Sequence, residues 1–297
     1  MIWLMYHSAD LDGASSGALL RYYHEKQGLK IDKDFKMIPM NYGNIFDESQ
    51  IKDGELVMMS DISLQPVSRM EELSKRCELF VFDHHKSVYP TLDANDVKGI
   101  WGDDQIAGCE LTWIYLFSAS SVPDFIRYLS DWDCWNDQDK IYWETTVKPF
   151  QMAIRSYETN PSTDTGYAFW ADWIGGINGD ESINEMINEG KTIIRYQTEM
   201  NIDLMKRSFD IEFEGLRFIV VNGYKGSPQF DSKWDSEKYD AMMSFYNMEN
   251  KYWTISMYTA KDIDLSVIAQ KWGGGGHNYA CGFSVKDITK VVGELKC

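Results

Sequence analysis

The chain has 297 residues, of which 44% are hydrophobic and 14% aromatic, and its formal net charge is −17. This length allows two domains with sizeable cores, and the composition is typical of a folded protein. The excess of acids, 46 against 29 Lys plus Arg, argues against a long nucleic acid duplex as partner, because basic residues supply such binding. A small phosphorylated substrate remains compatible, since bound divalent cations add local positive charge.

The cysteine pattern and the N-terminal residues indicate the cellular compartment of the protein. The five cysteines include no C-x-x-C pair, which indicates a reduced intracellular protein. The N-terminus lacks a basic segment and a cleavage site, and no run approaches the ~18 apolar residues of a membrane span. We therefore expect a cytoplasmic protein without a membrane partner. The sequence leaves the oligomeric state open, a homodimer included.

Apolar runs alternate with helical patterns in the first part of the chain. Three runs are typical of buried parallel strands, and each is followed by an acid or a histidine: residues 2–6, 56–59 and 79–82. Helical patterns cover residues 13–27, 67–77 and 107–117. This alternation predicts an α/β domain with a doubly wound, mostly parallel sheet.

The pattern changes after residue 150. Mixed signals extend to about residue 179, and a helix is predicted over 182–205. Strands follow at 209–213, 217–221, 241–246 and 252–258, with a helix over 266–272. We therefore predict a first domain at residues 1–180, a connecting helix at 181–207, and a second, smaller α/β domain at 208–297. The triplet at 190–192 resembles a phosphate-loop ending but lies mid-helix, so we interpret it as a solvated helix face.

The residues after the three strands are of types that bind metals. In an open α/β sheet, ligands bind beyond the carboxyl ends of the strands. One crevice would therefore collect His7, Asp10, Asp12, Asp61, Asp83, His84 and His85. Mixed carboxylate and imidazole ligands without thiolate favour Mn²⁺, with Mg²⁺, Co²⁺ or Fe²⁺ as alternatives. Two such ions, about 3.5–4 Å apart, can activate water and stabilise an in-line phosphoryl displacement.

Five motifs, taken in order, resemble those of one known family. They are HSADLDG at 7–13, Asp61, the triplet at 83–85 (DHH), SDWD at 130–133 and GGGGHNYACG at 273–282. Their order and spacing cover nearly the whole chain. The chain resembles the DHH phosphoesterases, with a DHH domain followed by the DHH-associated substrate-binding domain.

The resemblance implies a site with two metal ions. One ion would be held by His7, Asp10 and Asp61. The other would be held by Asp12, Asp61, His84 and one acid of the fourth motif. We favour Asp131 for that acid because it lies nearer the apolar stretch at 126–129, with Asp133 as the alternative.

The resemblance also implies roles for the remaining residues of the triplet. Asp83 would orient a metal ligand. His85 would face the substrate, where it could stabilise the phosphoryl oxygens or protonate the leaving group. Adjacent residues at a strand end point in different directions, so one histidine can bind metal while the other faces the cleft.

The glycine motif suggests where the substrate binds. The backbone N–H groups of Gly274, Gly275 and Gly276 could approach an anion closely, and His277 could add a directional donor. Family phosphodiesterases often have an arginine in the preceding strand, where this chain has Tyr258. A tyrosine can stack on a base or donate one hydrogen bond, but it cannot form a bidentate charged pair. The second domain would therefore bind a phosphate or sugar while the first cleaves.

The expected function is hydrolysis of phosphodiester bonds in short oligonucleotides or small nucleotide diesters, with two Mn²⁺ ions. Cyclic dinucleotides, 3′,5′-bisphosphate nucleotides and polyphosphate fit the same metals. A non-catalytic nucleotide-binding protein is the alternative of another class, which the intact ligand set disfavours. Trp132 and Trp135, beside the fourth motif, could stack on a base or pack the core.

Overall fold

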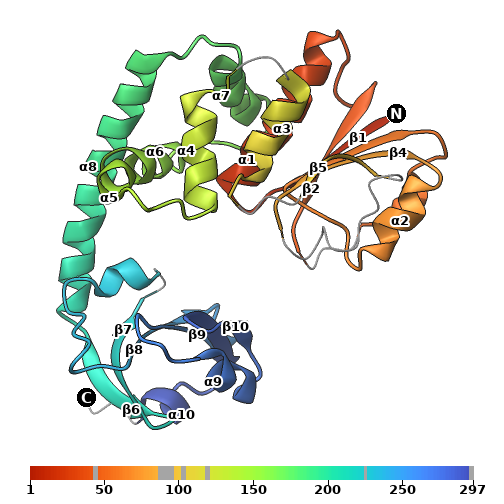
Figure 1. Ribbon diagram of the computed structural model, residues 1–297. Helices are drawn as coiled ribbons and strands as arrows, with labels where there is room; N and C mark the ends of the chain where they lie inside the picture. Colours follow the sequence, from red (N-terminus) through yellow and green to blue (C-terminus); the bar gives the residue numbers. More distant parts are fainter. Residues whose placement is uncertain (43–45, 86–96, 102–104, 118–120, 224–225, 294–297) are drawn as a thin grey trace. The chain divides into compact units, whose positions relative to one another are not determined.

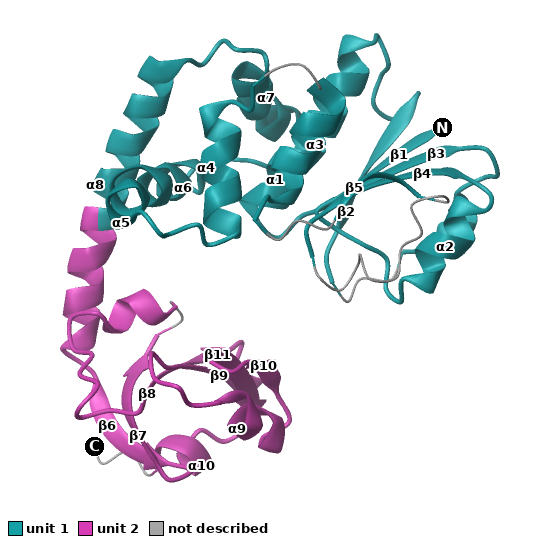
Figure 2. Ribbon diagram, in the orientation of Figure 1, with its two compact units in different colours: residues 1–194 teal, residues 195–297 magenta. Residues whose placement is uncertain are grey.

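The computed structural model describes residues 1–42, 46–85, 97–101, 105–117, 121–223 and 226–293. It forms two compact units, residues 1–194 and 195–297 (Figure 2). The first contains a five-stranded parallel sheet and the second a six-stranded mixed sheet. The predicted α/β class, with a parallel sheet first and a second α/β unit after it, is confirmed.

The sheet of the first unit contains the three predicted strands and two more. Its members are β1 (Ile2–His7), β2 (Phe35–Met40), β3 (Leu56–Ser60), β4 (Glu78–Asp83) and β5 (Lys98–Trp101). Their order is β2-β1-β3-β4-β5, so the predicted strands lie in the centre. Pro39 breaks the strand pattern of β2, and it is tolerated there because an edge strand leaves one row of N–H groups unpaired.

Helices cover both faces of this sheet, which explains the continuous apolar runs (Figure 1). Trp3 and Met5 pack toward α2 (Ser68–Ser74), in one core with its Met70 and Leu73. The alternate residues Leu4 and Tyr6 share a second core with Leu20 of α1 (Leu11–Lys26) and Leu111 of α3 (Gly108–Phe117). The central strand β1 therefore buries both of its faces.

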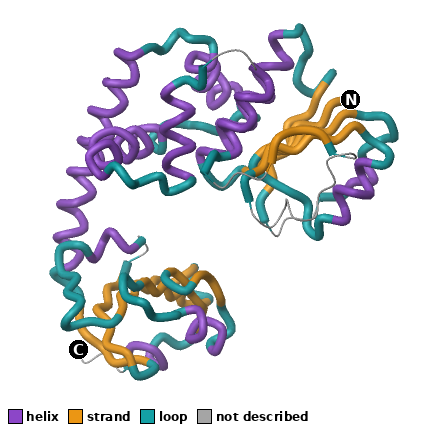
Figure 3. Tube along the Cα trace, in the orientation of Figure 1, coloured by secondary structure: helices purple, strands orange, loops and turns teal. Residues whose placement is uncertain are grey.

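A layer of helices follows the sheet in the first unit (purple in Figure 3). It consists of α4 (Asp124–Asp133), α5 (Lys140–Tyr142), a π-helical turn (Trp143–Val147), α6 (Lys148–Ile154), α7 (Asp164–Ile174) and the start of α8 (Asp180–Met205). Together with α1 and α3, these helices enclose a core that contains Phe150, Trp170 and Trp173. No helix among the described residues is long and apolar enough to cross a bilayer.

Gly190 is a packing residue. A Cβ atom at this position would lie 1.7 Å from the carbonyl oxygen of Pro149 in α6, so α8 and α6 approach here at backbone distance. The interpretation of the triplet as a solvated face holds for Lys191 and Thr192, which are exposed, but not for the buried glycine.

The second unit contains β6 (Phe209–Phe213), β7 (Leu216–Asn222), β8 (Ala241–Met248), β9 (Tyr252–Tyr258), β10 (Gly275–His277) and β11 (Ala280–Val285), with α9 (Ser266–Lys271) and α10 (Thr289–Val292). The strand order is β10-β11-β9-β8-β7-β6, and only β7 and β8 pair in parallel. The glycine motif therefore supplies edge strand β10. Short 3₁₀ helices lie at Glu48–Gln50 and Ser227–Phe230.

We predict that Gly190→Ala destabilises the protein. The added methyl group must displace the backbone at Pro149, which we expect to lower the free energy of unfolding by about 1–3 kcal/mol. At an open helical position the same change would gain about 1 kcal/mol, so the sign of the effect is diagnostic. Thermal denaturation measures it. The exposed neighbour serves as control, because Lys191→Ala should change stability by less than about 0.5 kcal/mol. A Gly190→Ala variant that melts at or above the wild-type temperature would contradict the prediction.

Candidate metal centre

Three neighbouring strands end at the same edge of the sheet, and each delivers a side chain to the site. His7 is the last residue of β1, Asp83 is the last residue of β4, and Asp61 directly follows β3. Asp61 has a φ of 57°, a left-handed conformation that non-glycine residues seldom adopt and that is often found at functional sites. Its N–H donates to the carbonyl of Phe82, which fixes this turn against β4.

The first ligand group consists of His7, Asp10 and Asp61. His7 Nδ1 lies 2.9 Å from Asp10 Oδ2 and 3.3 Å from Asp61 Oδ2. Asp10 is the N-cap of α1, because its Oδ1 accepts from the N–H of Gly13 at 2.9 Å. A Cβ atom at Gly13 would lie 2.0 Å from the His7 carbonyl oxygen, so the motif needs glycine where α1 passes the end of β1.

The second ligand group forms around His84. Its Nε2 lies 3.2 Å from Asp133 Oδ2, 3.5 Å from Asp61 Oδ1 and 4.0 Å from Asp12 Oδ2. Asp61 Oδ1 and His84 Nε2 are buried and have no hydrogen-bond partner in the described part of the chain. Buried polar atoms without partners are costly, and a bound cation would satisfy both of them. Carboxylate oxygens and imidazole nitrogens suit Mn²⁺ and similar ions, so these residues fit a metal.

The structure distinguishes the two acids of the fourth motif. Asp133, the last residue of α4, faces His84. Asp131, which the sequence favoured, does not lie with the other ligands: its two oxygens accept from the side chains of Asn136 and Tyr142. We therefore replace Asp131 by Asp133 in the candidate ligand set.

Asp12 is held by backbone amides of another helix. Its Oδ1 accepts from the N–H of Cys109 at 2.7 Å, and its Oδ2 accepts from the N–H of Gly108 at 2.9 Å, in the first turn of α3. A Cβ atom at Gly108 would lie 2.7 Å from the Cβ atom of Asp61. The start of α3 therefore packs directly on the site, and Oδ2 is the Asp12 oxygen nearer to His84.

Asp83 holds His85 in place. Its buried Oδ1 accepts from both the backbone N–H and the Nδ1 of His85, at 2.9 Å and 2.7 Å. His85 Nδ1 also lies 3.8 Å from Asp61 Oδ1. With Nδ1 directed toward Asp83, the opposite ring nitrogen is left for other contacts. This geometry agrees with the predicted orienting role of Asp83, and the role itself remains a prediction.

Two neighbours of the site escaped sequence analysis because they follow the unpredicted strand β2. Asn41 Oδ1 lies 3.4 Å from His7 Nε2. The ring of Tyr42 lies 5.7 Å from the rings of both His7 and His85, measured between centroids. Recognition of residues 35–40 as an edge strand would have placed both residues at the same sheet edge as His7.

Burial and close carboxylates shift the pKa values of the site. Burial raises the pKa of Asp12 well above its usual value, and the nearby Asp61 and Asp133 charges add to this effect. Burial also opposes ionisation of Asp61, but the hydrogen bond from His7 and the close imidazole of His84 outweigh it and lower its pKa to about 2. Hydrogen bonds that His7 donates to Asp10 and Asp61 raise the pKa of His7 to about 10. The site thus gathers several carboxylates around the imidazole of His7, whose raised pKa favours the protonated ring.

The predicted substrate-binding residues lie in the second unit. Gly275, Gly276 and His277 form β10, and Gly274 precedes it. His277 pairs with Ala280, and Ala280 pairs with Tyr258 across β11, so the tyrosine and the histidine point to the same face of this sheet. Gly274 approaches β11 closely, since a Cβ atom there would lie 2.0 Å from the carbonyl oxygen of Gly282. Their role in binding remains a prediction.

Comparison with known proteins supports the fold. No family model matches the chain. An uncharacterized protein of Acanthamoeba polyphaga mimivirus is 24% identical over 312 residues, which cover 96% of this chain and 68% of that protein. The pGpG-specific phosphodiesterase PggH of Vibrio cholerae superposes with a TM-score of 0.56 at 11% identity, over 97% of this chain and 94% of that chain.

A second solved structure is also similar. It is described as the DHH domain of a member of the s1p family of ribosomal proteins, with a TM-score of 0.58 at 15% identity, over 97% of this chain and 84% of that chain. At these identities the likeness establishes a shared fold. The structural neighbours thus confirm, at the level of the fold, the resemblance seen in the motifs.

We predict that Asp133→Asn weakens Mn²⁺ binding at least about 10-fold, because it removes a charged oxygen beside His84. Asp131→Asn is the matched control and should leave the affinity unchanged, since its oxygens face Asn136 and Tyr142. Isothermal titration calorimetry measures both affinities. Equal weakening in the two variants, or a larger loss in Asp131→Asn, would return Asp131 to the ligand set.

We also predict that Mn²⁺ binding releases protons near pH 7. In the metal-free protein His7 has a pKa of about 10, so its ring is protonated, and a metal ligand must be deprotonated. Because the pKa of His7 is raised, its protonated ring stabilises the metal-free fold. This stabilisation is fully present below the ordinary histidine pKa and is lost as the pH rises through about 10. Metal affinity should therefore increase by up to about tenfold per pH unit between pH 6 and 8. Calorimetry in buffers of different ionisation enthalpy counts the protons, and the absence of proton release would contradict this assignment of His7.

Proposed function

We propose that this chain is a metal-dependent phosphoesterase. The proposal rests on its fold and on the order of its motifs, which resemble those of the DHH phosphoesterases. One observation supports this most directly: the two carboxylate oxygens of Asp61 face different ligand groups, Oδ2 toward His7 and Oδ1 toward His84. A carboxylate placed in this way is suited to bridge two cations, the arrangement that catalyses phosphoryl displacement.

The proposed substrates are short oligonucleotides or small nucleotide diesters, with Mn²⁺ as the metal. Two of the candidate groups, His7–Asp10–Asp61 and Asp61–His84–His85, contain carboxylates and imidazoles alone, which supports Mn²⁺ over structural zinc; a third group adds the Cys134 thiol to His84 and Asp133. A phosphodiesterase that is specific for pGpG shares the fold, which supports a small nucleotide diester. The four described cysteines Cys77, Cys109, Cys134 and Cys281 are free, in agreement with an intracellular location.

When bound, two divalent cations would lower the pKa of a water nucleophile and neutralise charge on the phosphoryl oxygens. The protein would fix their positions through His7, Asp10, Asp12, Asp61, His84 and Asp133. His85, whose Nδ1 is held by Asp83, would direct its other ring nitrogen toward the leaving-group oxygen and donate a proton to it. The hydrogen bond and charge of Asp83 raise the pKa of His85, which favours the protonated ring that this step needs.

We predict that the wild-type protein with Mn²⁺ converts a 5′-phosphorylated RNA dinucleotide to mononucleotides, and that His85→Gln lowers kcat about 10²- to 10⁴-fold. His85→Gln should retain metal binding, whereas Asp61→Ala should lose both binding and turnover, because Asp61 contacts both ligand groups. Chromatography of the products and calorimetry with Mn²⁺ measure the two properties. Full activity of Asp61→Ala would refute the proposal, and Mn²⁺-bound protein without turnover on any phosphoester would favour a binding protein.

A further inference from the structure

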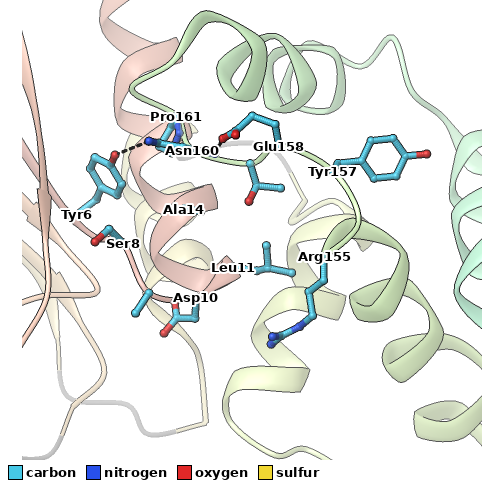
Figure 4. A pocket seen from close by; sticks show the side chains of 12 residues that line it. Tyr6, Ser8, Asp10, Leu11, Ala14, Arg155, Tyr157, Glu158, Asn160 and Pro161 are labelled. Carbon is cyan, nitrogen blue, oxygen red and sulfur yellow. Dashed lines mark hydrogen bonds between the residues drawn. The ribbon is translucent and has the colours of Figure 1, made fainter. Parts of the chain in front are cut away.

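A cavity of about 370 Å³ borders the first ligand group within the first unit (Figure 4). Asp10 and the start of α1 form one side of it, and Arg155, at the C-terminal end of α6, forms another. The hydrogen bond of 2.8 Å from the Tyr6 hydroxyl to Asn160 Oδ1 closes its wall. This volume falls within the about 300–1,000 Å³ typical of small-molecule sites.

Arg155 is the one cation among the described residues that line this cavity. No carboxylate of the described chain lies within ion-pair distance of its guanidinium, although the protein carries 46 acids. Figure 4 shows Arg155 and Asp10 extending into the same space. A guanidinium without an ionic partner, next to a candidate phosphoryl-transfer site, is suited to bind an anion from the solvent.

An aromatic platform positions this guanidinium. Arg155 Cζ lies 5.7 Å from the ring centroid of Trp132, which is within cation–π range. Trp132 in turn stacks on the buried ring of Trp143, with centroids 5.2 Å apart and planes inclined by 5°. Among the described residues, no hydrogen bond engages the side-chain N–H groups of Arg155, so these groups are available for a ligand.

The other ionisable groups of the cavity leave room for an anion. Glu158 has one carboxylate oxygen engaged by the backbone N–H of Asn160 at 2.8 Å. Tyr157 points away from the cavity (Figure 4) and donates to Glu189 at 2.8 Å. Asp10 belongs to the candidate metal ligands, so a bound cation would offset its charge. Arg155 then remains as the one cation among the described lining residues, and Glu158 keeps its carboxylate charge at the same cavity.

We propose that Arg155 binds a second phosphate group of the substrate, one that flanks the scissile phosphate and is not itself cleaved. This inference rests on the proposed function and adds a specificity residue to it. It assigns to the first unit a charged phosphate contact that Tyr258 cannot provide. The preferred substrates would be nucleotide diesters with a phosphate on the terminal nucleotide.

The test compares three dinucleotides: one with a 5′-phosphate, one with a 3′-phosphate and one with neither. We expect the wild type to favour one phosphorylated form, in kcat/KM, by about 10- to 100-fold. Arg155→Met should remove this preference and leave hydrolysis of the unphosphorylated dinucleotide unchanged. Arg155→Lys should retain part of it, because an ammonium keeps the charge but loses the bidentate geometry. Lys148→Met is the matched control, since it removes a cation of the same unit that pairs with Glu144 outside the cavity.

A binding measurement separates this inference from the proposed activity. The same three dinucleotides, with an uncleavable methylphosphonate link, are titrated into wild-type and Arg155→Met protein while tryptophan fluorescence is recorded. Phosphate-dependent binding that Arg155→Met weakens by about 10-fold or more would support the subsite even in a protein without turnover. Binding that does not depend on the terminal phosphate, or that is equal in the two proteins, would overturn the inference whether or not the chain is a phosphoesterase.

Discussion

The site depends on one buried carboxylate between two imidazoles. Asp61 follows β3 in a left-handed conformation, and its oxygens face His7 on one side and His84 on the other. Exchanging this carboxylate for an apolar residue would remove one close carboxylate from each ring, leaving Asp10 beside His7 and Asp133 beside His84. The ends of β1, β3 and β4 are thus organised around a single charge.

The acids of the site require compensation, and the chain supplies part of it through its backbone. The first backbone N–H groups of α3 donate to both oxygens of Asp12. The N–H of Gly13 donates to Asp10, and the N–H of His85 donates to Asp83. Backbone donors add no side chain to the crevice, so this space remains available for cations and substrate. The net negative charge of the chain is therefore no obstacle to a phosphorylated ligand at this position.

Sequence patterns predicted the central strands well and the periphery poorly, for physical reasons. Strands buried on both faces leave continuous apolar runs, which located His7 and Asp61. Strand β2 contains Pro39 and lies at an edge, so its pattern is broken and its neighbours Asn41 and Tyr42 were not foreseen. The choice between Asp131 and Asp133 depends on helical phase, because two residues differ by about 200° around a helix. Arg155 reaches the cavity only through the packing of α6, which no local pattern encodes.

The two ligand groups differ in how much of the chain they require. The group around His7 is complete once residue 61 is in place, since β1, the start of α1 and the turn after β3 supply every member. The group around His84 also needs Asp133, which arrives with α4 and the helical layer. During synthesis, which proceeds from the N-terminus, the first candidate cation site can therefore form on a nascent sheet. The second candidate site can form only after the helices have docked, so a cation bound there would mark a finished domain.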